Sequence, residues 1–463
     1  MPAGQGQEDA AAPAWHRYRR GLLLVVIGLA GFVTTLDNTV VTVALPTLQA
    51  EFGASLATLE WVVTGYVLTF SGFMLAGGRL ADVYGRRRAL VAGLAVFTAA
   101  SLAAGLATSA GALVAARLVQ GCGAALVLPA MLAVVAVGND DRRRSVGVAV
   151  WMASGAGALA LGPVVGGYLV QYLHWSWIFL LNVPLGVLLV ALAVAAIPES
   201  RDEAASRVDV PGVATSVVAL SAGTFGLTFG PELGWASPPI MAALAVGAVA
   251  AAVFVTVERI AVGRTGGAPM VDLALFRARA FTGGVLAQVL WGLGVNGVFF
   301  FTALFLQGVL GFSPTMSGLA FVPLALLVVV VTPLVPFAER RLGAARTVAL
   351  GLVMVAAGMA AVAFLRPGDG WADLLPAVCA IGAGSALTMP LGSAVLGAVP
   401  ESRAGVAGGV FSVAREMSGL FGVAVIGVIV NGSASFSAGY SVGLLVAAGL
   451  VVIGAAVSLV TLR

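Results

Sequence analysis

Lysine is missing from this sequence, cysteine and histidine occur twice each, and charged residues make up only 10% of the 463 positions. Without lysine the chain cannot contain the GxxxxGK[ST] motif that cradles nucleotide phosphates, which excludes ATP binding of that type. Cys122 and Cys379 lie within apolar runs, and His16 and His174 are isolated from one another. We therefore expect neither a disulfide nor a metal site.

Apolar residues dominate instead, because 60% of the chain is hydrophobic and the mean hydropathy is +1.05. These values are typical of a polytopic membrane protein, in which each helix needs about 20 apolar residues to cross the hydrocarbon core. A search at that length predicts fourteen spans, at residues 21–45, 56–76, 89–106, 110–137, 146–170, 178–197, 213–229, 240–262, 281–306, 320–337, 348–365, 374–396, 404–430 and 440–462.

Two polar connectors divide these spans into groups of six, two and six. The sequence thus predicts a polar tail at 1–20, a six-helix bundle at 21–200, an inserted two-helix hairpin at 211–262 and a second six-helix bundle at 280–463. The apolar run after the tail has no small-residue cleavage pattern, so we expect no cleaved signal peptide.

All 24 basic residues are arginines, and nearly all of them fall on one side of the membrane if the N-terminus is cytoplasmic. An excess of arginine in cytoplasmic loops sets the orientation of membrane proteins, so both termini are predicted to be cytoplasmic. This bias also accounts for the sequence pI of about 9.5 without a nucleic-acid partner.

The segment GRLADVYGRRR, residues 78–88, carries more than topology requires. Arginines alone would fix the orientation, but they leave an aspartate and two glycines unexplained. The segment resembles the loop between helices 2 and 3 of the major facilitator superfamily, G-x-L-a-D-r-x-G-r-r, and matches it at Gly78, Asp82, Gly85, Arg86 and Arg87. Val83 departs from the pattern. The resemblance implies a latch, in which the aspartate faces the N-terminal dipole of a helix in the other half.

Further segments resemble signatures of exporting branches of the same superfamily. GAGALALGPVVGG in the fifth predicted span resembles the antiporter signature, whose small residues permit close helix approach and whose proline loosens the helix. Its matching residues are Gly155, Gly162, Pro163, Gly166 and Gly167. LDNTVVTVALP in the first span and HWSWIFLLNVPLG at the sixth resemble signatures of 14-span drug:proton antiporters, with Thr42 and Ser176 replacing the usual Asn and Arg.

From Gly21 onward the chain is therefore similar to the 14-span drug:proton antiporters of the major facilitator superfamily. The resemblance implies an all-α membrane protein with the major facilitator fold, made of two six-helix bundles of inverted repeats and the two-helix insertion. It also implies alternating-access export of amphipathic drugs, antibiotics or related small molecules, driven by the proton gradient without a cofactor. We expect a monomer in the cytoplasmic membrane of a bacterium.

The two halves keep a trace of internal repetition. The segment FAERRLGAARTVALG, residues 337–351, takes the place of the latch loop in the second half, with Gly343 aligned to Gly85. Arg340 then falls opposite Asp82, so the second copy has lost its acid. The hairpin lies outside this symmetry, and we expect it to take no part in transport chemistry.

Asp37 is the only acidic residue that we place deep in the first half, and Arg117 lies at a similar depth in the fourth span. A charge at a helix centre costs about 2.5–3.5 kcal/mol on insertion scales, so such residues are functional candidates. RLVQGCGAA, which begins at Arg117, resembles the helix-4 signature whose arginine is associated with proton coupling. We predict Asp37 as the coupling carboxylate and Arg117 as the neighbour that tunes its protonation. The alternative is a fixed ion pair that only holds two helices together.

Glu416, beside Arg415 in the thirteenth span, is a second candidate for proton coupling or substrate binding. Neighbouring residues in a helix point in different directions, so we expect the two side chains to diverge. A packing role without transport chemistry is the alternative.

The predicted tenth span, 320–337, has no carboxylate, which favours neutral or singly charged amphipathic substrates over dications. Aromatic and amide side chains suited to a large apolar cavity are predicted at Trp61, Tyr66, Gln120, Asn296, Phe299, Phe300 and Gln307. Each of them is equally compatible with packing against lipid or core.

Other classes of function find less support in the sequence. There is no clustered catalytic set, so we expect no enzyme. An importer or a narrow-substrate metabolite exporter would share the fold, but the antiporter signature favours export. A non-transporting membrane sensor would need a signalling domain, for which the connectors are too short.

Overall fold

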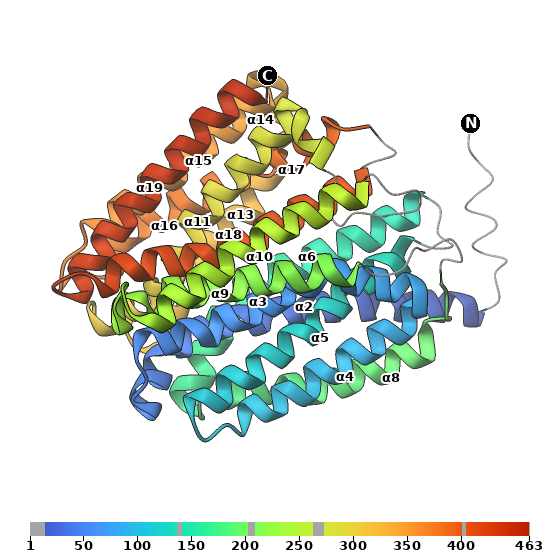
Figure 1. Ribbon diagram of the computed structural model, residues 1–463, viewed down its shortest axis with the longest axis horizontal. Coiled ribbons are helices and arrows are strands. Elements are labelled where there is room, and N and C mark those ends of the chain that lie inside the picture. The colour runs from blue at the N-terminus through green and yellow to red at the C-terminus, as the bar shows by residue number, and fades with distance from the viewer. Residues whose placement is uncertain (1–13, 137–140, 202–208, 263–272, 401–403, 463) are drawn as a thin grey trace.

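The computed structural model describes residues 14–136, 141–201, 209–262, 273–400 and 404–462, and nearly all of them are helical (Figure 1). Fourteen helical segments in this part of the chain are long and apolar enough to cross a membrane. The predicted all-helical membrane protein with fourteen spans is therefore confirmed.

The first six spans pack into an N-terminal bundle, lower in Figure 1. The sixth span is interrupted after one helical turn, so it counts as two helices. The elements are α2 (Ala14–Phe52), α3 (Leu56–Tyr84), α4 (Arg86–Gly105), α5 (Ala110–Ala136), α6 (Asp141–Tyr172), α7 (Trp177–Leu180) and α8 (Asn182–Ala196).

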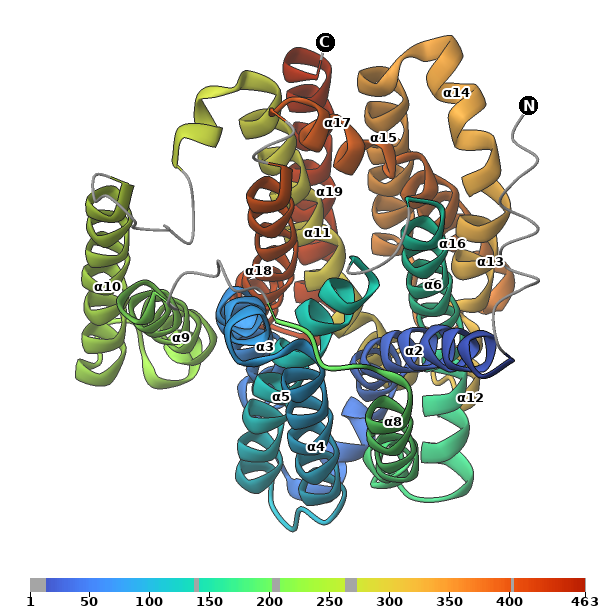
Figure 2. The ribbon, with the colours of Figure 1, turned by 90° about the vertical axis from the view of Figure 1, so that its right-hand side faces the viewer.

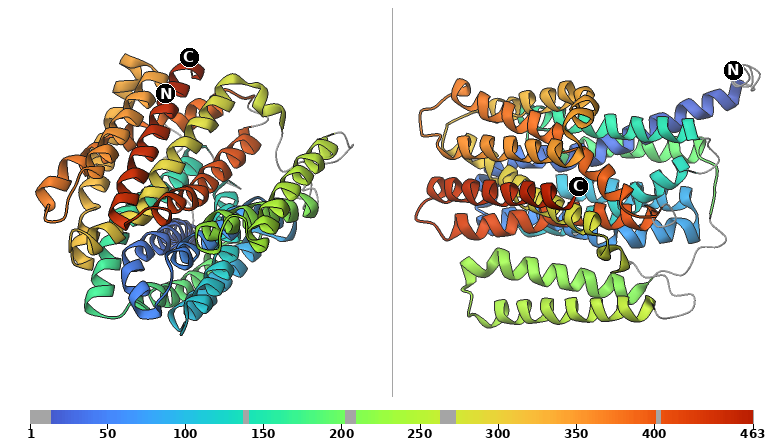
Figure 3. Two further views of the ribbon diagram at one scale, coloured as in Figure 1. Left: turned by 60° about the vertical axis from the view of Figure 1, so that its left-hand side comes forward. Right: turned by 90° about the horizontal axis from the view of Figure 1, so that it is seen from above.

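Two further helices, α9 (Val210–Leu233) and α10 (Pro238–Val262), form an antiparallel hairpin at one edge of the molecule (Figure 2). The inner helix, α9, packs against both α3 of the N-terminal bundle and α18 of the second bundle, whereas α10 packs chiefly on α9. Figure 3 shows the same hairpin along the outside of both bundles. It therefore covers one of the lines along which the two halves of the molecule meet, that of α3 with α18.

The remaining spans form a C-terminal bundle, in which prolines divide two spans into shorter helices. A proline lacks the backbone N–H and suits the first turn of a helix, so Pro323, Pro333, Pro336 and Pro390 each begin a new segment. The elements are η1 (Leu273–Arg277), α11 (Arg279–Gly308), α12 (Pro314–Leu319), α13 (Val322–Val331), η2 (Thr332–Leu334), α14 (Val335–Leu342), α15 (Ala344–Ala363), α16 (Trp371–Leu387), α17 (Pro390–Gly397), α18 (Ala404–Asn431) and α19 (Phe436–Thr461).

Gly85 and Gly343 occupy equivalent positions in the two bundles and have similar backbone conformations. Gly85 before α4 has φ +113°, and Gly343 before α15 has φ +80°. Both values lie in the left-handed region that glycine tolerates best. Each glycine is followed by a helix of 20 residues, Arg86–Gly105 and Ala344–Ala363. The repeat expected from aligning Gly343 with Gly85 thus reappears as a shared backbone turn.

The helices define two faces of the molecule, which we name from α2. The near face contains the start of α2, and the far face contains its end at Phe52. Since successive spans alternate in direction, α3 begins and α18 ends at the far face. The loop between α3 and α4 lies at the near face.

Candidate functional site

A buried ion pair lies inside the N-terminal bundle. Asp37 comes from the middle of α2 and Arg117 from the first third of α5, and an Nη1–Oδ2 distance of 2.5 Å joins them. Neither side chain has any exposed surface. A buried pair costs desolvation energy on both partners, so further hydrogen bonds are needed to hold it.

Neutral polar side chains from three other helical positions supply those bonds. Gln120 Nε2 donates to Asp37 Oδ1 at 2.8 Å, and Asn182 Nδ2 donates to the same oxygen at 2.6 Å. Gln120 also accepts from Arg117 Nη1 at 2.7 Å and donates to Ser101 Oγ at 2.7 Å. The carboxylate thus accepts hydrogen bonds from three side chains, Arg117, Gln120 and Asn182.

Arg117 is fixed on its other side by α3 and by an aromatic cage. Its Nε donates to the Val62 carbonyl at 2.9 Å. Its guanidinium carbon lies 4.4 Å from the ring centroid of Tyr66 and 5.7 Å from that of Phe179. Such cation–π contacts are strongest where water is excluded. One ion pair therefore ties together α2, α3, α4, α5, α7 and α8, so a change in its charge acts on the whole N-terminal bundle.

The proline-glycine segment of α6 packs in two directions. A side chain at Gly162 would run into Thr39 of α2, and one at Gly166 would lie 2.8 Å from the Val40 carbonyl oxygen. On the opposite side, Gly167 lies against Pro314, and Gly318 lies against the Pro163 backbone. Helix α6 therefore touches α2 of its own bundle and α12 of the other bundle through backbone-to-backbone approach.

Gly155, the first residue of this segment, has more room, because a side chain there would come no closer than 3.8 Å to Thr35. The tight part of the contact begins one to two turns later, at Gly162.

The loop between α3 and α4 is held within its own bundle. Asp82 Oδ1 pairs with Arg86 Nη2 at 2.9 Å. Glu199, just after α8, accepts from the Arg87 backbone N–H at 3.1 Å and lies 3.7 Å from the guanidinium Nε of both Arg87 and Arg88. Gly78 lies against Pro129 of α5. In this conformation Asp82 contacts its own loop, and the contact with the other half that the resemblance implied stays a prediction for another state.

Arg415 and Glu416 do not diverge as expected. Arg415 Nη2 lies 2.9 Å from Glu416 Oε1, and Nε of the same guanidinium lies 3.2 Å from it. The flexible arginine stem curls back along the helix and brings its charge to the neighbouring carboxylate. The arginine side chain is 46% exposed and the glutamate 22% exposed, whereas neither side chain of the Asp37 pair has any exposed surface.

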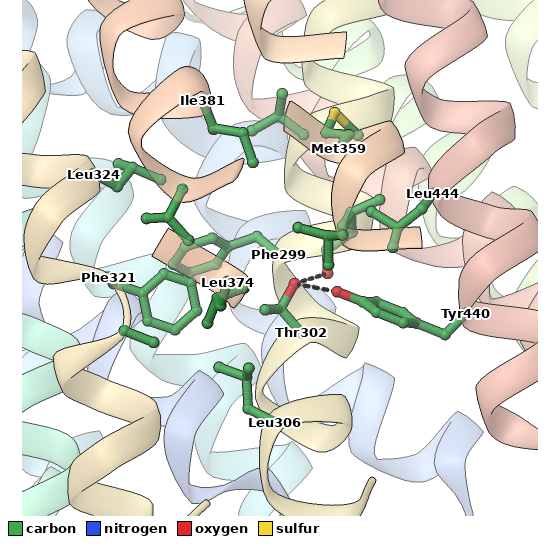
Figure 4. Close-up of a pocket in the computed structure, with 15 residues that line it drawn as sticks. Phe299, Thr302, Leu306, Phe321, Leu324, Met359, Leu374, Ile381, Tyr440 and Leu444 are labelled. Atoms are coloured by element: carbon green, nitrogen blue, oxygen red, sulfur yellow. Dashed lines mark hydrogen bonds between the residues drawn. The ribbon is translucent and has the colours of Figure 1, made fainter. Parts of the chain in front are cut away.

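A small apolar pocket of about 60 Å³ lies within the C-terminal bundle, lined by α11, α13, α15, α16 and α19 and by the turn between α12 and α13 (Figure 4). Phe299 and Phe321 stand on one side with ring centroids 4.6 Å apart. On the other side Tyr440 shares a 2.9 Å hydrogen bond with Thr302, whose hydroxyl also donates to the Val298 carbonyl at 2.8 Å. The pocket therefore suits an apolar or aromatic group.

The sequence profile of the Major Facilitator Superfamily matches residues 27–423. The chain belongs to this superfamily. Among curated relatives, the cephamycin export protein CmcT of Amycolatopsis lactamdurans is 36% identical, covering 87% of this chain and 83% of its own. The multidrug resistance protein Stp of Mycobacterium tuberculosis is 34% identical over 88% and 75%. The methylenomycin A resistance protein of Streptomyces coelicolor is 32% identical over 95% and 92%.

Solved structures of the superfamily share the same fold. A POT family transporter crystallised with 5-aminolevulinic acid superposes with a TM-score of 0.71 at 12% identity, over 94% of this chain and 95% of that one. At so low an identity the likeness concerns the fold alone. The match confirms the prediction of a major facilitator fold.

Four of the side chains predicted to line a substrate cavity pack elsewhere in this structure. Tyr66 and Gln120 belong to the buried charge cluster described above. Trp61 faces α9, with its ring centroid 6.4 Å from those of Phe225 and Phe229. Phe300 is buried against Phe301, because its helix turns it into the core.

The other three predicted cavity residues lie along α11. Phe299 lines the apolar pocket. Asn296 packs against Gly419 of α18, where a side chain in place of the glycine hydrogen would lie 3.2 Å from Asn296 Nδ2. Gln307 donates to the Val43 carbonyl of α2 at 2.9 Å and so joins the two halves.

Between residues that the structure describes, three hydrogen bonds join the two halves, and all three lie at the far face. Besides the Gln307 bond, the Thr315 N–H donates to Gln171 Oε1 at 3.1 Å, and Asn431 Nδ2 lies 3.5 Å from Glu60 Oε1. We use the term far seam for this set of contacts. The halves are therefore closed against each other at the far face.

The first half contains a second buried acid that its sequence pattern does not reveal. Glu60 of α3 has no exposed surface, so Asp37 is not the only buried acid in that half. Glu60 lies one turn after the start of its span, where an acid ordinarily reaches the membrane surface. Helices α9 and α18 cover it, and no local sequence pattern predicts that contact.

Proposed function

We propose that this protein is a proton-coupled antiporter that exports amphipathic drugs or antibiotics across the bacterial cytoplasmic membrane. Its relatives are named for antibiotic export and resistance, which supports the substrate class and the direction of transport. The observation that carries proton coupling is the fully buried Asp37–Arg117 pair, since ionisable groups inside a membrane are expensive and mark proton or substrate pathways.

The near face is assigned to the cytoplasm, because the arginine-rich loops fall there. With the far seam closed, the conformation described above then corresponds to an inward-facing state. A substrate reaches the protein from the cytoplasm or the inner leaflet, and its apolar part has a suitable place in the pocket beside Phe299, Phe321 and Tyr440.

A proton arriving from outside neutralises Asp37 and removes its attraction for Arg117. The hydrogen bonds from Gln120 and Asn182 then lose their charged acceptor, and charge-assisted bonds are about twice as strong as neutral ones. The N-terminal bundle therefore relaxes between two arrangements, one for each charge state of Asp37. The latch loop around Asp82 and the flexible α6 convert this difference into alternate opening of the two faces.

The proton gradient is proposed as the only source of energy, with no cofactor, and the protein is proposed to be a monomer and not an enzyme. No group of three or more histidine, cysteine or acidic side chains with metal-binding geometry occurs among the described residues. The transport machinery needs a proton path and a cavity, and neither requires a bound ion.

The test is proton release from acidified everted vesicles on addition of a panel of antibiotics and hydrophobic dyes. We expect release on addition of a transported compound in the native protein and none in Asp37→Asn. Glu51→Gln serves as the control, because Glu51 is an exposed carboxylate at the end of α2. Release that survives Asp37→Asn would refute Asp37 as the coupling acid and make Glu416 the next candidate.

Silence across the whole panel, with folded protein present in the membrane, would contradict broad export. A narrow-substrate exporter would then be favoured, since two of the relatives above are named for a single antibiotic or antibiotic class. An importer would take up a labelled compound in vesicles of the opposite orientation.

A further inference from the structure

Glu60 lies where three parts of the molecule meet. It belongs to α3 of the N-terminal bundle, its Oε1 is 3.5 Å from Asn431 Nδ2 at the end of α18, and its carboxyl lies against Gly427 of the same helix. Its neighbour Trp61 stacks on Phe229 of the hairpin. The N-terminal bundle, the C-terminal bundle and the hairpin thus share one buried carboxyl.

The carboxyl itself is poorly satisfied. Glu60 Oε2 and the hydroxyl of Thr228 on α9 are buried without a hydrogen-bond partner. Thr228 faces the carboxyl, but with a geometry too poor for a hydrogen bond. Unsatisfied polar atoms in a protein interior cost free energy and call for an explanation.

No cation balances Glu60 among the residues that the structure describes. From α18 the facing groups are Asn431 and Gly427, which are neutral, and from α9 they are the neutral Thr228 and the acidic Glu232. A buried carboxylate without a cation and next to a second acid is strongly disfavoured, whereas a protonated carboxyl is neutral and can donate to a hydroxyl.

We propose that Glu60 is a proton-binding site that locks the far seam: the closed seam holds its carboxyl protonated, and loss of that proton opens the far face. The proton comes from water on the far side and returns to it when α3 separates from α9 and α18. Because Glu60 is closed off from the near face, its proton is not carried across. This is therefore a switch operated by external pH, and it is distinct from the coupling proposed for Asp37.

The charges around the seam set the direction of the switch. Ionised Glu60 would repel Glu232 and would need water, and both effects separate the hairpin and α18 from α3. Protonated Glu60 removes the repulsion and supplies a donor that Thr228 Oγ1 lacks in the described geometry. Acid on the far side should therefore close the seam, and neutral or alkaline conditions should open it.

The experiment measures how accessible a cysteine at the far seam is to a membrane-impermeant maleimide, in right-side-out membranes without substrate. Cys122 and Cys379 are replaced by alanine, and Thr315→Cys is the reporter, because Thr315 Oγ1 is buried beside α6. A separate protein with Leu173→Cys is the reference, because Leu173 is 57% exposed at the same face. The ratio of the two labelling rates removes the reagent's own pH dependence.

With Glu60 in place we expect the ratio to rise by about tenfold from about pH 5.5 to about pH 8, because one linked proton changes a population tenfold per pH unit at most. In Glu60→Gln, which mimics the protonated form, the ratio should stay low and flat. Glu51→Gln, a matched change at the same face, should keep the rise.

A rise that persists unchanged in Glu60→Gln would overturn the proposal, as would a flat ratio in the native background. Misfolding of the variant would appear as high labelling at every pH, and Thr228→Val, which removes the acceptor and keeps the volume, then repeats the test with a weaker rise expected. The labelling ratio needs neither substrate nor transport, so its result is independent of whether the protein is an antiporter. Labelling of Leu173→Cys also tests the orientation on which the assay rests.

Discussion

At the scale of single residues, the buried cluster around Asp37 behaves as one unit with a balanced charge. A buried pair contributes little net stability compared with an apolar pair of the same size, but an unpaired buried charge is very costly. The Asp37 cluster is completed by hydrogen bonds from Gln120 and Asn182 to the carboxylate and from Gln120 to Ser101, while Arg117 Nη2 and Asn182 Oδ1 have no hydrogen-bond partner. The charge balance can therefore be tested by removing one partner or both.

Arg117→Gln should lower the stability of the protein by about 3–5 kcal/mol, because it leaves Asp37 without its cation. The double change Arg117→Gln with Asp37→Asn should regain most of that loss, since both charges are then removed together. The measurement is the apparent thermal unfolding temperature of the purified protein in detergent. If the double variant unfolds no later than Arg117→Gln alone, the two residues do not balance each other.

Only part of this cluster could be predicted from sequence. Asp37 and Arg117 stand out because ionisable residues are rare in apolar spans. Ser101 and Asn182 are small and neutral, and such side chains are common in spans without any role. Their contribution depends on how α4 and α8 are placed beside α2, and that placement follows from tertiary packing.

At the scale of helices, the sequence predicted all fourteen spans, but it shortened the tenth, which prolines divide into several short helices. The tenth span was predicted at 320–337 and extends over Pro314–Leu342, with Glu339 near its end. An apolar window stops where charged or turn-forming residues begin, whereas prolines in first turns restart the helix and prolong the span. The prediction that the tenth span has no carboxylate therefore holds for residues 320–337, the apolar part of the span.

The close contact between α2 and α6 predicts that alanine has opposite effects on stability at Gly166 and at Gly157 of α6. Gly166→Ala would place a methyl group 2.8 Å from the Val40 carbonyl oxygen, and a backbone atom cannot rotate away. We expect a loss of about 1–3 kcal/mol and slower export. In Gly157→Ala the methyl group meets no atom within 4 Å, so helix propensity should stabilise the protein by up to about 1 kcal/mol.

Unfolding temperature and the initial rate of dye export measure both effects for the two alanine variants. Equal behaviour of Gly166→Ala and Gly157→Ala would contradict the packing described for α6.

At the scale of the whole molecule, the two halves meet only at the far seam through described hydrogen bonds, so the far face must open for export. Gln171→Cys and Thr315→Cys face each other across that seam, where the native pair has an N–Oε1 distance of 3.1 Å. Joining them with a short thiol cross-linker in the protein without native cysteines should abolish export completely. A reducible linker should restore it on reduction.

Each single cysteine variant treated with the same reagent is the control for this cross-link and should keep its activity. Export that continues in the fully cross-linked double variant would mean that the far seam does not move during transport.

The hairpin also makes the lines along which the two bundles meet differ in their exposure to lipid. The two bundles approach each other between several pairs of helices, and two of these lines are α3 with α18 and α6 with α12 and α13. Helix α9 covers the first line and leaves the second one bare. A hydrophobic compound that diffuses within the leaflet therefore meets α9 at the first line, whereas at the second line it meets α6, the helix that carries the antiporter signature.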